Sequence, residues 1–268
     1  MTAPAPTASD FYVRGELDNA IHAVTLEVKA APRDFDKRGF LAELLAIRGE
    51  LDRADAQLDA MAKLDTGASP GLALFRQLLR AERTRIEVHR QGRAPELLAP
   101  ATPAVRAALQ ALTLLRAGDA AGAAQAAEQF EQERPKVTGT CDGVKFDDFR
   151  DLDDICAGVL EVLTSTGKLM WLPFESIASI AFDKPARPRD LLWRPAEVSV
   201  RGGPDGKVYV PATYAPTRGE SDDAARLGRR TDWLGGESEP VTGVGLRTFL
   251  VGEETKTVLE IANLEFNG

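Results

Sequence analysis

The sequence predicts an α+β protein in two parts: a domain of paired helices over residues 1–140, followed by a small, mostly antiparallel and barrel-like β domain over residues 141–268. Two observations predict this division. Apolar residues recur at helical spacing in the first half of the chain, whereas short apolar runs separated by turn-forming residues dominate the second half. A six-residue segment also repeats within the helical part, which is typical of stacked helix pairs.

The repeated segment organises the helical part. Gly15-Glu-Leu-Asp-Asn-Ala20 recurs 34 residues later as Gly49-Glu-Leu-Asp-Arg-Ala54, and a weaker copy begins at Gly118. We expect the glycine to make the turn between the two helices of a unit, and Pro32 and Pro135 to end the second helix. This spacing of Gly, Ala and Pro in a period of 34 resembles tetratricopeptide repeats, so a tetratricopeptide-like α-α repeat domain is predicted.

Five helices are predicted from apolar residues that lie three and four positions apart. Prolines and glycines interrupt the repeat between residues 65 and 102, which leaves an irregular helical bundle as the alternative to a regular stack. The predicted helices cover residues 36–47, 50–63, 72–90, 103–116 and 119–134.

A stretch from Asp147 to Trp193 connects the two parts, after a loop predicted at residues 135–146. Acids at its start suit a helix N-cap, and Gly167 suits the position after a helix C-terminus. An amphipathic helix that packs on both parts is therefore predicted here. The apolar residues at helical spacing are Leu152, Ile155, Cys156, Val159, Leu160 and Leu163.

The β part is predicted from short apolar runs that alternate with turn residues. Gly202–Gly206 and Gly252–Glu254 are typical of hairpin loops, and the polar segment Ala215–Gly236 is predicted to be a mobile loop with a short helical turn at Ala224–Arg229. The expected strands cover residues 168–173, 177–182, 196–201, 207–211, 246–251 and 256–266.

Composition excludes several classes of protein. The net charge of −8 argues against nucleic acid as the main partner, because phosphate binding needs a clustered basic surface. Two cysteines without metal-site spacing suit a reduced compartment, and no signal peptide or membrane-spanning run is found, so the cytoplasm is expected. The sequence also lacks a P-loop, a dinucleotide fingerprint and a nucleophile elbow, and no cofactor is expected.

Three groups of residues are candidates for a functional role. The acids Asp147, Asp148, Asp151, Asp153 and Asp154 suit a hard cation or acid–base chemistry, but acids at a helix N-terminus also serve the helix dipole. The tryptophans are more simply explained as anchors of the domain interface than as a ligand box, with an ion pair between Arg230 and Asp232 beside them. These tryptophans are Trp171, Trp193 and Trp233.

The third group lies on the helical part. Stacked helix pairs leave a concave face that is built from the first helix of each unit and suits a peptide or helix of another protein. Four charged residues on those helices are therefore candidate partner-binding residues, although solvated charges or ion pairs within a helix are the simpler explanation. They are Arg38, Arg76, Glu82 and Arg85.

Several segments together resemble one protein family. The most specific are Gly167-Lys-Leu-Met-Trp171-Leu-Pro173-Phe174, Arg189-Asp190-Leu-Leu-Trp193-x-Pro195-Ala196, Tyr214, Arg230-Thr231-Asp232-Trp233 and Gly243-x-Gly-x-Arg247. With the repeated Gly-Glu-Leu-Asp unit, they resemble the ImpE family, also called SciE or TagJ, an accessory of bacterial type VI secretion. The resemblance covers nearly the whole chain and implies no enzyme activity. It implies binding to the small subunit of the contractile sheath and, in some systems, to the AAA+ ATPase that recycles the sheath.

The sequence therefore predicts a cytoplasmic, non-enzymatic adaptor that docks a helix of a sheath protein on its helical part. Two alternatives remain open. One is a metal-dependent enzyme that uses the acids between Asp147 and Asp154, and the other is a scaffold that forms homodimers through its β part.

Overall fold

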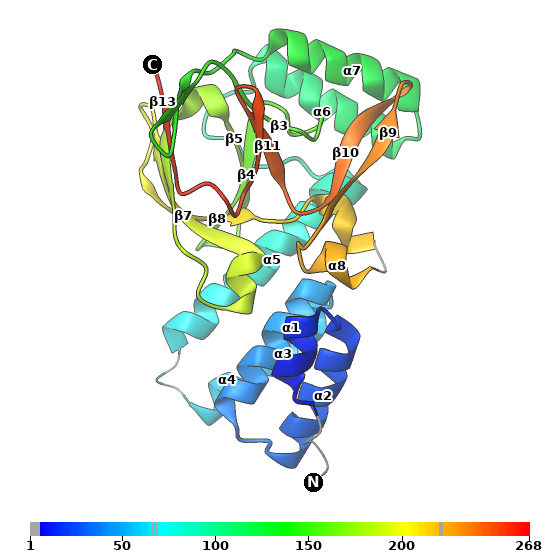
Figure 1. Cartoon of the computed structure of the whole chain (residues 1–268), viewed down its shortest axis with the longest axis vertical. Helices are drawn as coiled ribbons and strands as arrows, with labels where there is room; N and C mark the ends of the chain where they lie inside the picture. Colours follow the sequence, from blue (N-terminus) through cyan, green and yellow to red (C-terminus); the bar gives the residue numbers. More distant parts are fainter. Residues whose placement is uncertain (1–5, 66, 68, 220–221) are drawn as a thin grey trace.

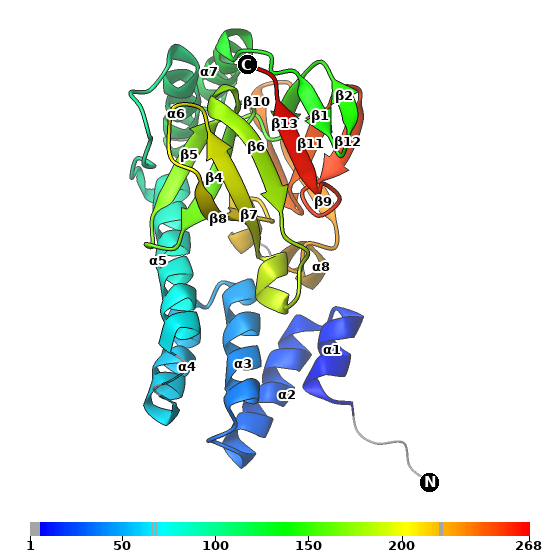
Figure 2. The same ribbon diagram turned by 90° about the vertical axis from the view of Figure 1, so that its left-hand side faces the viewer.

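The computed structural model describes residues 6–65, 67, 69–219 and 222–268. Helices come first in the chain and strands follow, so the predicted α+β class is confirmed. In Figure 1 the first four helices form one end of the molecule, while the strands and the α6–α7 hairpin form the other. The long helix α5 (Ser69–Gln91) runs between the two ends and lies beside β4 and β5 in Figure 2.

Helices α3–α7 agree closely with the five predicted ranges because the signals that predict them are local, while α1 and α2 had no predicted range. Thr7, Asp34 and Thr102 accept a hydrogen bond from a backbone N–H in the first turn of their helices, as helix N-caps do. The helices that precede the first strand are α1 (Ala8–Arg14), α2 (Leu17–Ala30), α3 (Phe35–Arg48), α4 (Leu51–Leu64), α5 (Ser69–Gln91), α6 (Pro103–Arg116) and α7 (Ala120–Glu133).

The turn glycines of the repeat have the predicted role. Gly15, Gly49 and Gly118 lie between the paired helices and have φ values of +85°, +88° and +79°. This is the left-handed region, which residues with a Cβ enter only at a cost. Ala20 and Ala54, five residues after the first two glycines, are fully buried where the paired helices approach each other.

The third helix pair departs from a regular stack. The α6–α7 hairpin lies against the β part. The two pack so closely that a Cβ atom added at Gly158, just before β4, would lie 3.1 Å from the Phe130 ring of α7. The interruption predicted between residues 65 and 102 is the reason: α5 extends for 23 residues without a partner of its own repeat unit, and the following segment leads away from α1–α4.

The strands in the described part of the chain form one large and two small sheets, and their pairs within these sheets are antiparallel. The large sheet has the order β2-β1-β13-β6-β7-β8-β4-β5, and the small ones have the orders β12-β11-β3 and β10-β9. The bounds are β1 (Gly139–Cys141), β2 (Val144–Phe146), β3 (Phe149–Asp151), β4 (Val159–Thr164), β5 (Leu169–Pro173), β6 (Ile177–Phe182), β7 (Trp193–Val200), β8 (Gly206–Pro211), β9 (Thr231–Gly236), β10 (Glu239–Gly245), β11 (Thr248–Val251), β12 (Glu254–Thr257) and β13 (Asn263–Phe266).

The large sheet is open, so the barrel-like shape predicted for the β part is wrong. Strands β2 and β5 are its two edges and do not pair with each other. The β5 edge is covered at one point, where Glu96 from the α5–α6 connection forms a parallel bridge to Met170. The backbone of Glu96 donates to Leu169 O and accepts from Trp171 N–H at 3.0 Å each.

The amphipathic helix predicted after Asp147 is also wrong. This segment contains β3, a series of turns over residues 152–158 and β4. Strand β4 is buried on both faces, so its sequence, Val-Leu-Glu-Val-Leu, lacks the alternation that marks a half-buried strand. Gly167 has the expected left-handed φ of +85°, but it lies in the turn between β4 and β5 rather than after a helix.

Smaller differences concern the loops. The predicted loop at 135–146 contains the β1–β2 hairpin, and the predicted strand at 256–266 is interrupted, forming β12 and β13. The predicted mobile loop at 215–236 contains the short helices η3 (Ala215–Gly219) and α8 (Asp223–Arg226) and strand β9, with residues 220 and 221 outside the described part. The two predicted hairpin loops, after β7 and after β11, are confirmed.

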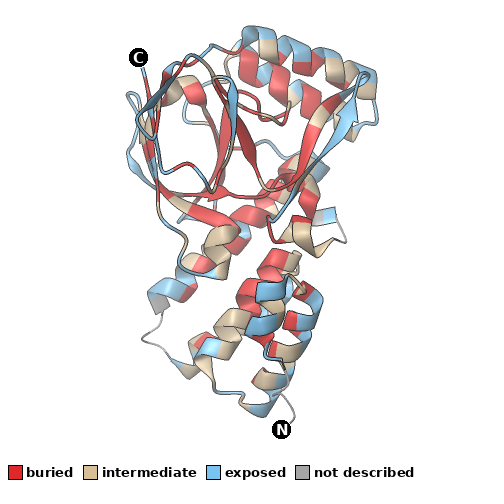
Figure 3. Ribbon diagram, viewed as in Figure 1, coloured by how far each residue is buried: buried red, intermediate tan, exposed pale blue. Residues whose placement is uncertain are grey.

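The core is continuous across the two parts. On one face of β4, Val159 and Leu163 pack into the hydrophobic cluster of the helices, together with Trp171 and Trp193. On its other face, Leu160 and Val162 belong to a second cluster inside the sheets. Figure 3 accordingly shows buried residues concentrated where α5 crosses the strands.

Gly39 within helix α3 and Gly49 at its C-terminal end allow a matched test of the role of the turn glycine. Gly49→Ala should lower the free energy of unfolding by about 1–2 kcal/mol, because alanine must adopt the left-handed conformation there. Gly39→Ala should instead raise it by about 0.5–1 kcal/mol, since Gly39 is helical and the added Cβ meets only Met61 Cε at 3.5 Å. Urea denaturation followed by circular dichroism measures both; effects of the same sign would contradict the role assigned to Gly49.

Candidate functional site

A buried carboxylate, Glu161 of β4, joins helix α5 to the sheet. Its Oε2 accepts hydrogen bonds from Arg85 Nε at 2.9 Å and from Arg247 Nη2 at 2.6 Å. Its Oε1 lies 2.8 Å from His89 Nε2 and accepts from Trp171 Nε1 at 3.4 Å. The side chains of Glu161, Arg85 and Arg247 are at most 1% exposed, so three charges are held inside the protein by one another.

Arg247 extends this network to a second buried acid. Its Nη1 donates to Asp151 Oδ2 at 2.8 Å, while Tyr214 donates its hydroxyl proton to Asp151 Oδ1 at 2.8 Å or to Thr248 O at 2.9 Å. The Arg247 guanidinium also lies over the Tyr214 ring, 5.3 Å from its centre. Arg247 thus connects β4 to the segments that carry β3 and β11.

Helix α5 also contacts the β part through Glu82 and through a second hydrogen bond of Arg85. Trp193 of β7 donates its indole N–H to Glu82 Oε2 at 2.9 Å, and Arg85 Nη2 donates to Thr213 O at 2.9 Å. Glu82 is completely buried and lies 3.6 Å from Arg85. Glu82 and Arg85, which lie within one turn of α5, therefore bind to three segments of the β part: β4, β7 and the segment after β8.

The surroundings of Glu161 and Asp151 shift the pKa values of these two acids in opposite directions. Burial alone disfavours the charged form of Glu161, but the charges of Arg85 and Arg247 and the contact with His89 outweigh it and hold the pKa of Glu161 well below its usual value. Burial is the larger influence on Asp151, and its pKa is raised although Arg247 opposes the rise. The network is therefore centred on an ionised Glu161.

The acids predicted as a cation site do not converge. Asp147 is exposed, Asp148 pairs with Arg134 at 2.6 Å, and Asp151 belongs to the network described above. Asp153 accepts from the backbone of Ile155 and Gly243, and Asp154 from Val241 N–H and Arg150. Within the described residues, no group of three or more His, Cys, Asp or Glu side chains is placed to hold a metal ion.

The predicted partner-binding residues have different surroundings. Glu82 and Arg85 are buried against the β part and so do not lie on an exposed face. Arg38 donates to Pro32 O and Gln57 Oε1, while Arg76 pairs with Asp55 at 2.9 Å beside a cavity between α4 and α5.

The tryptophans divide into two kinds. Trp171 and Trp193 are fully buried and donate to acids at the contact of α5 with the sheet. Trp233 is 42% exposed on β9 and packs on Tyr214, with ring centres 5.7 Å apart. Arg230 and Asp232 form the suggested ion pair beside it, with both side chains about half exposed.

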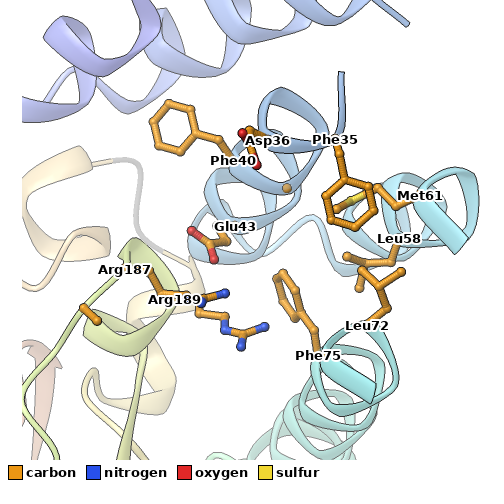
Figure 4. Close-up of a pocket in the computed structure, with 13 residues that line it drawn as sticks. Phe35, Asp36, Phe40, Glu43, Leu58, Met61, Leu72, Phe75, Arg187 and Arg189 are labelled. Carbon is orange, nitrogen blue, oxygen red and sulfur yellow. The ribbon is translucent and has the colours of Figure 1, made fainter. Parts of the chain in front are cut away.

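An apolar groove is the candidate binding site. It lies between α3, the end of α4, the start of α5 and the short helix η2 (Pro188–Leu191), and encloses about 450 Å³. Figure 4 shows its aromatic and aliphatic side chains facing one another, with Arg187 and Arg189 reaching in from the β part. Its apolar walls are formed by Phe35, Phe40, Leu58, Met61, Leu72 and Phe75.

Charged residues lie among these apolar walls. Glu43 of α3 is only 8% exposed, and burial raises its pKa to about 7 although the charges of Arg189 and Arg187 oppose the rise. Arg189 lies over the Phe75 ring, 5.0 Å from its centre. The sequence does not predict the groove, because α3 and η2 are far apart in the chain. The one local pattern that could have indicated it is the presence of aromatic residues near two helical glycines, Gly39 and Gly71.

Comparison with known proteins identifies the family. A family model described as ImpE protein matches residues 143–265. The chain is also 34% identical over 230 residues to the type VI secretion system accessory component TagJ of Pseudomonas aeruginosa (strain PAO1), covering 86% of this chain and 82% of that one. The chain belongs to this family of type VI secretion accessory components.

The fold has a crystallographic counterpart. The crystal structure of protein VPA1032 from Vibrio parahaemolyticus superposes with a TM-score of 0.91, covering 97% of each chain at 28% sequence identity. The two proteins thus share both the helical part and the sheets although most of their residues differ. Within the described residues, none of the helices has the length and apolar character needed to cross a membrane.

Removal of Arg247 tests the buried network. Arg247→Met should lower the free energy of unfolding by about 3–5 kcal/mol, because it leaves Asp151 and Glu161 buried without their shared cation. Arg230→Met is the matched control and should cost at most about 1 kcal/mol, since its ion pairs are half exposed. Chemical denaturation measures both, and similar losses in the two variants would show that the network does not hold the parts together.

Glu43 makes stability depend on pH. Its pKa rises from 4.5 in the unfolded chain to about 7 when folded, so the folded protein binds the extra proton between these values. The stabilisation that this proton uptake adds to folding is about 3 kcal/mol at most. It is fully present below pH 4.5 and is lost as the pH rises through 7. Relative to wild type, Glu43→Gln should therefore gain stability at pH 8 but little at pH 5. An equal difference at the two pH values would contradict this assignment.

Proposed function

We propose that this chain is a cytoplasmic, non-enzymatic adaptor of the type VI secretion machinery that holds a helical segment of the small sheath subunit in the α3–α5 groove. Bound in this way, it would present the sheath protein to the AAA+ ATPase that recycles the sheath. The observation that carries the proposal is the groove itself, an apolar channel of about 450 Å³ between paired helices in a family of type VI accessory components.

The shape and lining of the groove support a helical ligand. Amphipathic helices bind in apolar grooves by inserting side chains from one face, and the groove offers aromatic, thioether and branched aliphatic walls for such anchors. Phe40 and Phe35 are half-buried without a ligand, so a docked helix would remove further apolar surface from water. Each large apolar anchor fully buried in this way contributes about 1.5–3 kcal/mol.

The construction of the groove supports a preformed site. Helix α5 supplies one wall through Leu72 and Phe75, and the C-terminal half of the same helix is fixed to the sheet by Arg85 and Glu82. The opposite end of the groove is closed by η2, which belongs to the β part. A site whose walls are held in place before binding loses little entropy on binding.

Gly39 allows the groove to be blocked without disturbing the helix that carries it. Gly39→Leu should weaken binding of the purified small sheath subunit at least about tenfold, because a leucine side chain occupies the space that the docked helix needs. Gly39→Ala is the control and should bind like wild type. Isothermal titration calorimetry measures both, with circular dichroism to confirm folding.

The test has two decisive outcomes. If the wild-type protein does not bind the sheath subunit, the proposed partner is wrong. If Gly39→Leu binds as tightly as wild type, the partner is right and its assignment to the groove is wrong.

A further inference from the structure

The groove carries opposite charges at its two ends. Asp36 lies in the first turn of α3, and Glu43, seven residues later, faces Arg187 and Arg189 of the η2 segment. Seven residues of an α-helix span about 10 Å, so the acidic end and the basic end are roughly two turns apart. Figure 4 shows Asp36 on the side of Phe35 and Phe40, away from the two arginines.

The basic end is available to a ligand. Arg187 is exposed and forms no ion pair with another described residue. Its backbone is fixed, because Asp190 Oδ2 accepts hydrogen bonds from Ala186 N–H at 3.0 Å and Arg187 N–H at 3.2 Å. Arg189 is held over Phe75 and lies 4.0 Å from Asp190, whose carboxylate is thus already engaged.

The buried acid beside them does not neutralise this end. Glu43 is the nearest carboxylate on α3, but its pKa of about 7 means that it carries only part of a negative charge at neutral pH. Two guanidinium groups, Arg187 and Arg189, therefore face the partly ionised Glu43 and the single carboxylate of Asp190, so that cations outnumber ionised acids at this end. The surplus is positive, in a chain whose net charge is −8.

The acidic end is equally available. Asp36 is exposed and, across the described part of the chain, has no ion-pair partner. The N-cap role at this helix end is filled by Asp34, which accepts from Lys37 N–H at 3.0 Å. The carboxylate of Asp36 is therefore not needed to cap α3 and remains free to meet a cation.

We propose that the groove selects an amphipathic helix with an acidic side chain toward Arg187 and Arg189, a basic side chain toward Asp36 and apolar anchors between them. The two charged positions lie about seven residues apart in the docked helix, which matches the spacing along α3. Because the charges differ at the two ends, they also fix the direction of the helix: the reverse orientation would place like charges together. This inference rests on the proposed function, since the ligand is a helix in the same groove.

Charge reversal in the full-length protein tests the inference, with the purified small sheath subunit as the probe. Arg187→Glu and Asp36→Lys should each weaken binding about tenfold at low salt, since each replaces an attraction with a repulsion at one end. Arg187→Lys keeps the charge and should therefore weaken binding less than Arg187→Glu does. Arg80→Glu is the control: it makes the same charge change on the exposed surface of α5, outside the groove lining, and should change binding less than about twofold.

The salt dependence of binding separates the electrostatic contribution to affinity from the steric one. Raising the salt from about 0.05 M to about 0.5 M should reduce the losses caused by Arg187→Glu and Asp36→Lys, because screening shortens the reach of exposed charges. The loss caused by Gly39→Leu should remain, since it is steric. Circular dichroism on each variant confirms that the overall helical content is unchanged.

The outcomes distinguish this inference from the proposed function. If Gly39→Leu blocks binding but both charge reversals bind like wild type at low salt, the groove assignment stands and the charge selection is overturned. If Arg80→Glu weakens binding as much as Arg187→Glu, the effect reflects net charge and the inference is again overturned. If wild type does not bind, the proposed function itself fails.

Discussion

The structure depends on one buried carboxylate that is shared by two arginines, one from the helical part and one from the β part. Glu161 accepts from Arg85 of the helical part and from Arg247 near the C-terminus, with all three side chains at most 1% exposed. Burying any one of these charges without its partners would cost several kcal/mol of folding free energy. Each of the three residues is therefore stable in the interior only when the others are present. This mutual requirement holds α5 in one position on the sheet.

The position of α5 in turn determines the groove. The helix has 23 residues; its C-terminal half carries the network, while its N-terminal half carries Leu72 and Phe75 of the groove wall. The opposite wall is α3, which meets η2 of the β part near Glu43 and Arg189. The candidate binding site is therefore assembled from both parts, although its walls are mainly helical. The β part acts on the groove through η2 and through its hold on α5.

The fold shows why the acidic stretch after residue 146 does not form the predicted helix. Its acids have the composition of a helix N-cap, but Asp147 is exposed and the other four cap a turn, pair with an arginine or enter the network. Strand β4 is covered on one face by α5 and on the other by the second hydrophobic cluster, so its residues are nearly all apolar and mimic a helical stripe. The exception in that run, Glu161, is the polar residue on which the contact with α5 depends.

The sequence by itself determined helices α3–α7, the turn glycines and strands β5–β8 and β11, because caps, turn residues and apolar spacing act over a few neighbouring residues. Segments that resemble the ImpE family also predicted the family correctly from sequence. Only the tertiary structure decided the path from β3 to β4, the open sheet, the burial of Glu82 and Arg85, and the groove. These features depend on contacts such as Arg85 to Glu161 and Arg247 to Glu161, which join residues 76 and 86 positions apart. No local pattern records which distant charge a buried acid will meet.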